Sequence, residues 1–349
     1  FRRDDAELMY ASPLVIVIAP GMMIAYYLLA GELEAYTFAM LFLNFALFYA
    51  YYHVARQHWG FVVLYAVKNG ESDAAGRNSD VALMFFGMAY PFIHFMVYKL
   101  SLIALLADIP LAAWEHVWES FAYLGVTGLL FAKGFGLLGK GCHYLGRLLT
   151  NVSFILLFAV LLGLVFDLFG LQTSLMAMTD LFLVGFVVAV LVALVRAVLA
   201  IRSGVSLNMP KCLLVVVVLA THNIILFLPL PFMVIIMALT LFHNLQYHRM
   251  VRFYNVNKYL APGAKKHYGF AVKLTEKLLL LLVFMFLFSV PFTALRVATL
   301  NIALNDVLPI LVKTVIWGVA FHHYVLDAHI WRVGRNTKLR QNLKLSAYD

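Results

Sequence analysis

Long apolar segments alternate with short polar ones along the whole chain. Most of the apolar segments have about 18 or more residues and few charges, which is the length an α-helix needs to cross the hydrocarbon core of a membrane. The fourth segment also carries Lys133 and several glycines, so it could continue as an amphipathic segment at the membrane surface. The pattern predicts about ten spanning helices, at residues 12–30, 36–58, 81–106, 119–139, 151–170, 178–201, 212–228, 230–250, 274–300 and 307–331.

The composition agrees with this pattern. Hydrophobic residues make up 64% of the 349 positions, charged residues make up 12%, and the mean hydropathy is +0.91. Soluble domains have about half apolar and about a quarter charged residues. No stretch between the apolar segments is long enough for a soluble domain. We therefore predict an all-α, polytopic integral membrane protein in which residues 1–349 form a single transmembrane helical domain.

Basic residues fall in alternate loops. The loop after the second predicted helix carries Arg56, Lys68 and Arg77, whereas "GELEA" and "LPLP" carry none. By the positive-inside rule, the basic loops and both termini are cytoplasmic, with Lys99 and Arg296 as exceptions. We expect the protein in a bacterial inner (cytoplasmic) membrane. No run of Lys and Arg is long enough to bind nucleic acid.

Seven of the twelve histidines lie at the predicted cytoplasmic ends of three helices. The orientation was derived from Lys and Arg alone, so the common depth of these histidines is an independent observation. Polar residues at this depth are costly and usually functional. The alternative is that they are interfacial side chains whose tips reach water. The seven are His53 and His58, His243 and His248, and His322, His323 and His329.

The spacing of these histidines suits a metal site. His53 and His58 are five positions apart, about 140° around a helix, so they could straddle a site but could not bind one ion along a straight stripe. Imidazole suits iron, copper, zinc and nickel. We predict that all seven are metal ligands. Three further residues, as ligands or as groups that orient a ring, are Asp327, His222 and Asn244. Gln57 and Gln246 could also hold ring N–H groups in place.

His222 leaves two interpretations open. It lies within the seventh predicted helix beside Asn223. It could be a deep metal ligand, or the two residues could form a buried polar pair that holds helices together.

The histidine boxes resemble those of the membrane-bound multi-histidine di-iron enzymes, which include fatty-acyl desaturases, sterol and fatty-acid hydroxylases and alkane hydroxylases. The matching segments are "HVARQH" from His53, "HNLQYH" from His243 and "HHYVLDAH" from His322. The chain departs from that pattern because it has no HxxHH box, more predicted spans and no sizeable cytoplasmic cap.

This resemblance implies non-haem iron, one or two ions, and an O2-dependent oxidoreductase of lipid metabolism. The reaction would be hydroxylation, desaturation or oxidative cleavage of a lipid-soluble substrate. The chain has no flavin, haem or ferredoxin motif, so electrons would come from a separate protein. The basic cytoplasmic face would favour an acidic ferredoxin- or rubredoxin-like donor.

Two other classes fit parts of the pattern. A haem-binding or structural subunit of a membrane redox complex could use two of the histidines on facing helices as axial ligands. A transporter would place polar groups near the bilayer midplane. A Soret band would indicate haem, and the absence of bound metal would favour transport or a structural role.

Overall fold

The computed structural model describes most of the predicted helices. The described residues are 14–29, 32–71, 73–99, 170–263, 268–300, 307–331 and 336–345, with isolated positions at 122–163 and at 333. The helices predicted at 119–139 and 151–170 lie almost entirely outside them. Every regular element in the described residues is helical and none is a strand, which confirms the all-α prediction for this part of the chain.

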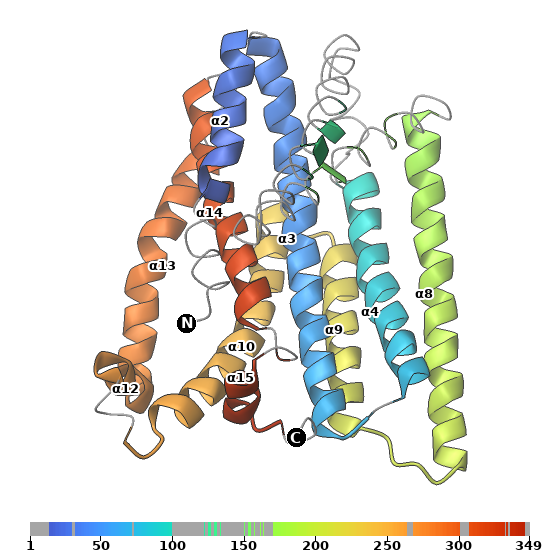
Figure 1. Ribbon diagram of the computed structural model, residues 1–349. Helices are drawn as coiled ribbons and strands as arrows, with labels where there is room; N and C mark the ends of the chain where they lie inside the picture. Colours follow the sequence, from blue (N-terminus) through green and yellow to red (C-terminus); the bar gives the residue numbers. More distant parts are fainter. Residues whose placement is uncertain are drawn as a thin grey trace. The chain divides into compact units, whose positions relative to one another are not determined.

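The described helices follow the apolar segments in order (Figure 1). A short π-helical segment, η1, continues α4, and a break at Lys277 separates α12 from α13. The elements are α2 (Leu14–Leu29), α3 (Glu32–Lys68), α4 (Ala74–His94), η1 (Phe95–Lys99), α8 (Leu171–Arg202), α9 (Met209–Phe227), α10 (Phe232–Tyr259), α12 (Phe270–Glu276), α13 (Leu278–Leu300), α14 (Val307–Ile330) and α15 (Thr337–Asn342).

Two histidine-bearing helices, α3 and α10, extend further than the sequence predicted, and this corrects the position of their histidines. α3 continues to Lys68 because "GFVVLYAVK", residues 60–68, is an apolar segment with no proline to stop it. α10 continues to Tyr259 as a more polar helix. The histidine pairs of both helices therefore lie within helices, whereas the sequence predicted them at helix ends.

Three of the described helices are long and apolar enough to cross a membrane: Ala74–Lys99, Gln172–Arg202 and Met209–Phe227. α10 has a shorter apolar part because polar side chains begin at His243 and continue to its end. Among the described side chains of α13, the apolar stretch is Leu278–Leu287. The larger number of spans and the cytoplasmic termini stay predictions.

Tertiary contacts divide the chain into two compact units, and each unit is described by itself. The prediction of a single transmembrane domain stays a prediction. Unit 1 comprises Phe1–Tyr49, Ile103–Leu175 and Thr293–Ile330, and unit 2 comprises Ala50–Leu102, Met176–Phe292 and Trp331–Asp349.

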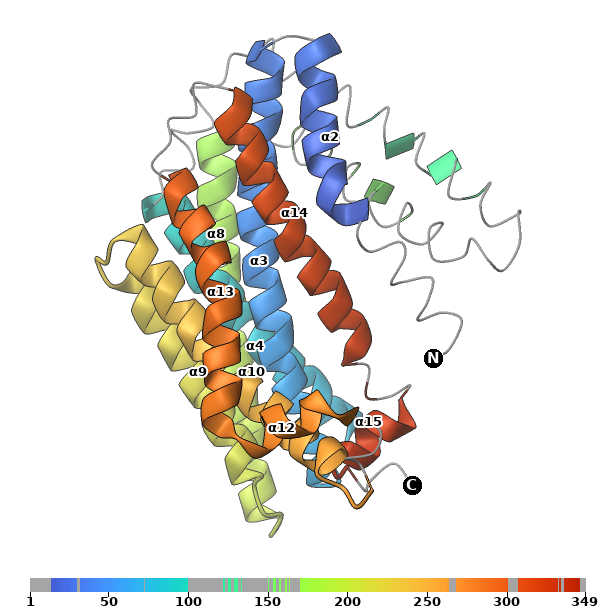
Figure 2. The ribbon, with the colours of Figure 1, turned by 90° about the vertical axis from the view of Figure 1, so that its left-hand side faces the viewer.

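In unit 1, α2 packs against α14 (Figure 2). The contact is closest at Gly318, where an added Cβ would lie 2.5 Å from the backbone oxygen of Ile16. Phe321, one turn further along α14, packs edge-on against Tyr49 at a ring separation of 5.2 Å. The α2–α14 contact therefore depends on the absence of a side chain at Gly318.

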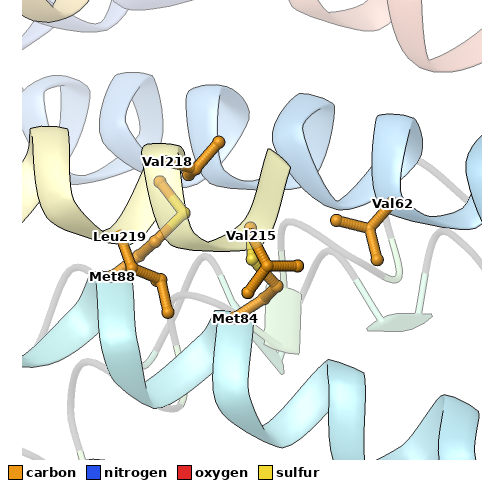
Figure 3. Close-up of a cluster of buried hydrophobic side chains, with 6 residues drawn as sticks. All are labelled: Val62, Met84, Met88, Val215, Val218 and Leu219. Atoms are coloured by element: carbon orange, nitrogen blue, oxygen red, sulfur yellow. The ribbon is translucent and has the colours of Figure 1, made fainter. Parts of the chain in front are cut away.

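In unit 2, the second half of α3 packs with α4 and α9 around an apolar core (Figure 3). α8 packs against α4 at Gly185, where an added Cβ would lie 2.5 Å from the ring of Phe86. The core thus holds α3, α4 and α9 side by side. Its buried residues are Val62, Met84, Met88, Val215, Val218 and Leu219.

Ion pairs join two loops at one end of unit 2. Lys211 at the start of α9 bonds to Glu71 and Asp80, at 2.5 and 2.8 Å. Arg196 of α8 donates to Asp73, which also caps α4 by accepting from the backbone N–H of Gly76 and Ala75. The Arg196 guanidinium and these two N–H groups lower the pKa of the Asp73 carboxyl. The α3–α4 and α8–α9 loops therefore lie at the same end of unit 2.

The other end of unit 2 holds Lys99, one of the two exceptions to the charge pattern. Its ammonium donates to the backbone oxygens of Phe227 and Leu228, at 2.6 and 2.7 Å. These carbonyls end α9 and have no partner within the helix, and a cation there also interacts favourably with the helix dipole. Lys99 therefore caps α9.

A proline inside α4 is compensated by α9. Pro91 has no N–H, so the carbonyl of Gly87 loses its partner within the helix. The amide of Asn223 donates to that carbonyl at 3.1 Å, and to the backbone oxygen of Leu219 at 2.8 Å. Asn223 therefore joins α9 to α4 and leaves its neighbour His222 in a fixed position.

Candidate metal centre

Four histidines from three helices meet inside unit 2. His53 and His58 come from α3, His222 from α9 and His243 from α10, and each side chain is at most 9% exposed. The ring centres of His58 and His222 are 5.2 Å apart, those of His58 and His243 are 5.7 Å apart, and those of His53 and His243 are 6.3 Å apart. Two imidazoles on one metal have ring centres no more than about 6.5 Å apart, because each metal–nitrogen bond is about 2 Å.

The closest pair in this cluster is His58 and His222. Their Nε2 atoms face each other at 3.3 Å. Two nitrogens bound at about 2.0–2.1 Å to one tetrahedral metal ion are about 3.4 Å apart. The pair therefore already has the nitrogen separation of two ligands of a single ion. Both side chains are fully buried.

Tyr51 determines which nitrogen of His222 carries the proton. Its hydroxyl donates to the backbone oxygen of Met88 at 3.0 Å and lies 3.0 Å from Nδ1 of His222. A hydroxyl has one proton and a carbonyl only accepts, so the Tyr51 oxygen accepts a hydrogen bond from Nδ1–H of His222. The Nε2 atom of His222 then carries a lone pair, directed at His58.

A second polar residue lies beside His58. Gln246 of α10 is adjacent to the His58 ring. Within the described part of the chain, Nδ1 of His58 and Oε1 of Gln246 are both buried and have no hydrogen-bond partner. When His58 carries its proton on Nε2 and donates it to His222, Nδ1 of His58 is an acceptor. Oε1 of Gln246 is also an acceptor, so these two atoms cannot bond to each other.

Two of the residues predicted from α10 are not in the cluster. His248 and Asn244 are exposed, and the His248 ring neighbours that of Tyr247. Positions 243 and 248 are about 140° apart on a helix, so burial of His243 turns His248 outward.

The predicted residues of α14 belong to unit 1. His322 is half-buried, His323 is exposed and Asp327 is buried. Nε2 of His323 lies 3.3 Å from a carboxylate oxygen of Asp327, a pair of groups that could take part in holding a metal ion. The side chain of His329 lies outside the described residues. The prediction that these residues share one site with the histidines of unit 2 stays a prediction.

The sequence alone did not identify Tyr51 as part of the site. The tyrosine lies in "FALFYAYYHVARQHW", which reads as an interfacial aromatic segment. It is seven positions before His58, so the two residues share a helix face, and this shared face was a usable signal.

His222 lies about 20 Å along α9 from its start at Met209, so the cluster is not at the end of that helix that joins the α8–α9 loop.

No protein-family model matches the chain, and no curated protein or solved structure does either.

Proposed function

We propose that the four histidines of unit 2 bind non-haem iron, in a membrane-embedded oxidoreductase that uses O2 on a lipid-soluble substrate. One observation carries the proposal: the Nε2 atoms of His58 and His222 face each other at 3.3 Å in a fully buried position. The ring of His243 lies next to that of His58, and the ring of His53 lies next to that of His243.

A metal ion would suit the observed orientation of the Gln246 amide. Without metal, a His58 ring that donates from Nε2 to His222 has an acceptor at Nδ1, and the Gln246 amide would have to turn its NH2 group, in place of Oε1, toward that atom. A metal held by both Nε2 atoms would leave the His58 proton on Nδ1, where Gln246 can accept it. Binding would therefore satisfy both atoms.

The choice of iron depends on the chemistry of the ligands and on the histidine boxes. Imidazole nitrogens suit iron, copper, zinc and nickel alike. The boxes from His53 and His243 are the ones that resemble the di-iron enzymes, and both contribute to the cluster. Bound iron would supply open coordination positions for O2, and the buried side chains around it would exclude water.

Each of the three candidate reactions has its own electron balance. Hydroxylation places one oxygen atom of O2 in a C–H bond and reduces the other to water, using two electrons and two protons. Desaturation removes two hydrogens from adjacent carbons and reduces both oxygen atoms to water, again with two external electrons and two protons. Oxidative cleavage of a C=C bond places one oxygen on each carbon and needs no external electrons. An acidic ferredoxin- or rubredoxin-like donor is required only for the first two.

The surface of α8 supports a lipid environment and a lipid-soluble substrate. Large apolar side chains along this helix are more than half exposed, which suits contact with acyl chains and not with water. A substrate dissolved in the bilayer would reach the protein through such a surface. The residues of α8 that are more than half exposed include Leu181, Val184, Leu194, Val195, Leu199 and Ile201.

The haem alternative is less consistent with the closest pair. Two axial histidines on opposite sides of an iron would have nitrogens about 4 Å apart, with the porphyrin plane between them. The 3.3 Å separation of His58 and His222 is shorter than that.

Metal analysis of the purified protein, with an optical spectrum of the same sample, tests the proposal. We expect one or two iron ions per chain and no Soret band. His58→Leu and His222→Leu should each lower the iron content at least about tenfold, because each removes a ligand. His94→Leu is the matched control, since His94 lies among the rings of Tyr98 and Phe227, away from the cluster.

Three outcomes would overturn the proposal. Unchanged iron content in both His58→Leu and His222→Leu would show that the cluster is not the site. A Soret band would make the protein a haem protein. Absence of metal, after purification without chelators, would favour a transport or structural role.

A further inference from the structure

We propose that Tyr51 and Gln246 are positioning residues of this centre. Each accepts the Nδ1–H of one histidine, so that the Nε2 lone pairs of His222 and His58 point at the same metal ion. The inference rests on the proposed metal centre and assigns two residues that do not touch the metal.

Tyr51 has a fixed position because three helices hold it. It belongs to α3, donates to the backbone of α4 at Met88 and bonds to His222 of α9, with both distances at 3.0 Å. Its ring stacks on Phe92 with a centre separation of 4.0 Å and an angle of 5°. The hydroxyl therefore cannot turn to donate to His222 without losing its bond to Met88.

Gln246 is placed to do the same for His58. It lies three positions after His243 on α10, so both residues lie on neighbouring faces of that helix. Its Oε1 is a buried acceptor beside the His58 ring, whose Nδ1 is the other buried atom without a partner. A proton on that Nδ1 makes the two atoms a donor and an acceptor.

The two contacts have one chemical consequence. A neutral imidazole binds metal only through the nitrogen that lacks a proton. Acceptors at both Nδ1 atoms hold the protons there and leave both Nε2 atoms free for the ion. Groups that orient a metal-bound histidine in this way typically contribute 10- to 100-fold in metal affinity.

Metal affinity in matched variants is the first test, measured with ferrous iron against a competing chelator. We expect Tyr51→Phe to weaken binding about 10-fold or more. Tyr52→Phe makes the same change one position away, on an exposed side chain, and should stay within about twofold. Gln246→Met removes the acceptor and should weaken binding, whereas Gln246→Glu keeps an acceptor and should match or exceed the wild type. Wild-type affinity in both Tyr51→Phe and Gln246→Met would overturn the inference.

A second readout does not need metal. Nitrogen-15 NMR of histidine-labelled, metal-free protein separates the two tautomers of a neutral imidazole, and the His222 signals are those lost in His222→Leu. We expect Nδ1–H at His222 in the wild type and in Tyr52→Phe, and a shift toward Nε2–H in Tyr51→Phe. An Nε2–H tautomer at His222 in the wild type would overturn the role of Tyr51, even if Tyr51→Phe does not fold. A wild type that shows the expected tautomer but binds no metal would instead contradict the proposed function.

Discussion

At the scale of single residues, polar side chains inside apolar helices have specific backbone partners. The clearest case is the carbonyl of Gly87, which Pro91 leaves without its helical donor and which Asn223 satisfies from α9. The sequence allowed two roles for the pair His222 and Asn223, a metal ligand or a polar link between helices. In the structure the two residues have different partners: Asn223 links α9 to α4, and His222 faces His58 in the cluster.

Replacement of Asn223 tests this link. We expect Asn223→Leu to lower the free energy of unfolding by about 1–3 kcal/mol, because the buried carbonyl of Gly87 loses its donor. Pro91→Ala restores a backbone N–H that can donate to the same carbonyl. In the Pro91→Ala background, Asn223→Leu should therefore cost clearly less. Reversible unfolding in mixed micelles measures all four proteins, and strictly additive effects would show that the two residues are not coupled.

At the scale of elements, the existence and order of the long described helices follow from the apolar segments, but the short α15, several boundaries and the packing do not. Hydropathy ended the second predicted helix at residue 58, whereas α3 passes through the polar residues before that point and continues along the apolar segment 60–68 to Lys68. The contacts that place α2 on α14 depend on a single glycine. Such a contact joins positions far apart in the sequence and has no local signal.

Two glycine substitutions test the packing of unit 1, with opposite expected signs. Gly318→Ala should destabilise the protein by about 1–3 kcal/mol, since the new Cβ would meet the rigid backbone of Ile16. Gly21→Ala, on α2, meets nothing within 4 Å. It should stabilise the helix by about 0.5–1 kcal/mol, because alanine loses less backbone entropy. The same unfolding assay measures both, and equal effects would contradict the close contact at Gly318.

At the scale of the whole molecule, the charge pattern and the structure of unit 2 agree on which loops share an end. The positive-inside rule grouped the α3–α4 and α8–α9 loops, and Lys211 joins them through Glu71 and Asp80. The candidate site was harder to predict. Histidine spacing indicated α3 and α10, and the sequence offered Gln246 as a group that holds a ring N–H. Tyr51 matters only because other helices fold against it, which composition and periodicity do not record.

Chemical labelling of unique cysteines tests the orientation. In a chain whose Cys142 and Cys212 are replaced by serine, we introduce Asn69→Cys, Ser203→Cys or Pro229→Cys. A membrane-impermeant maleimide should reach the first two only from the cytoplasmic side and the third only from the other side. Labelling of Asn69→Cys and Ser203→Cys from different sides would contradict the shared end, and reversal of all three would reverse the topology.

The contact of Lys99 with α9 has a consequence for the order of events during synthesis. Lys99 is made 128 residues before Phe227, whose carbonyl it binds. At about 5–20 residues per second, the ribosome delivers that partner about 6–25 s after the lysine. During this interval the ammonium at the end of η1 must stay hydrated. The cap on α9 can therefore form only after α9 has been made and has packed beside the end of η1.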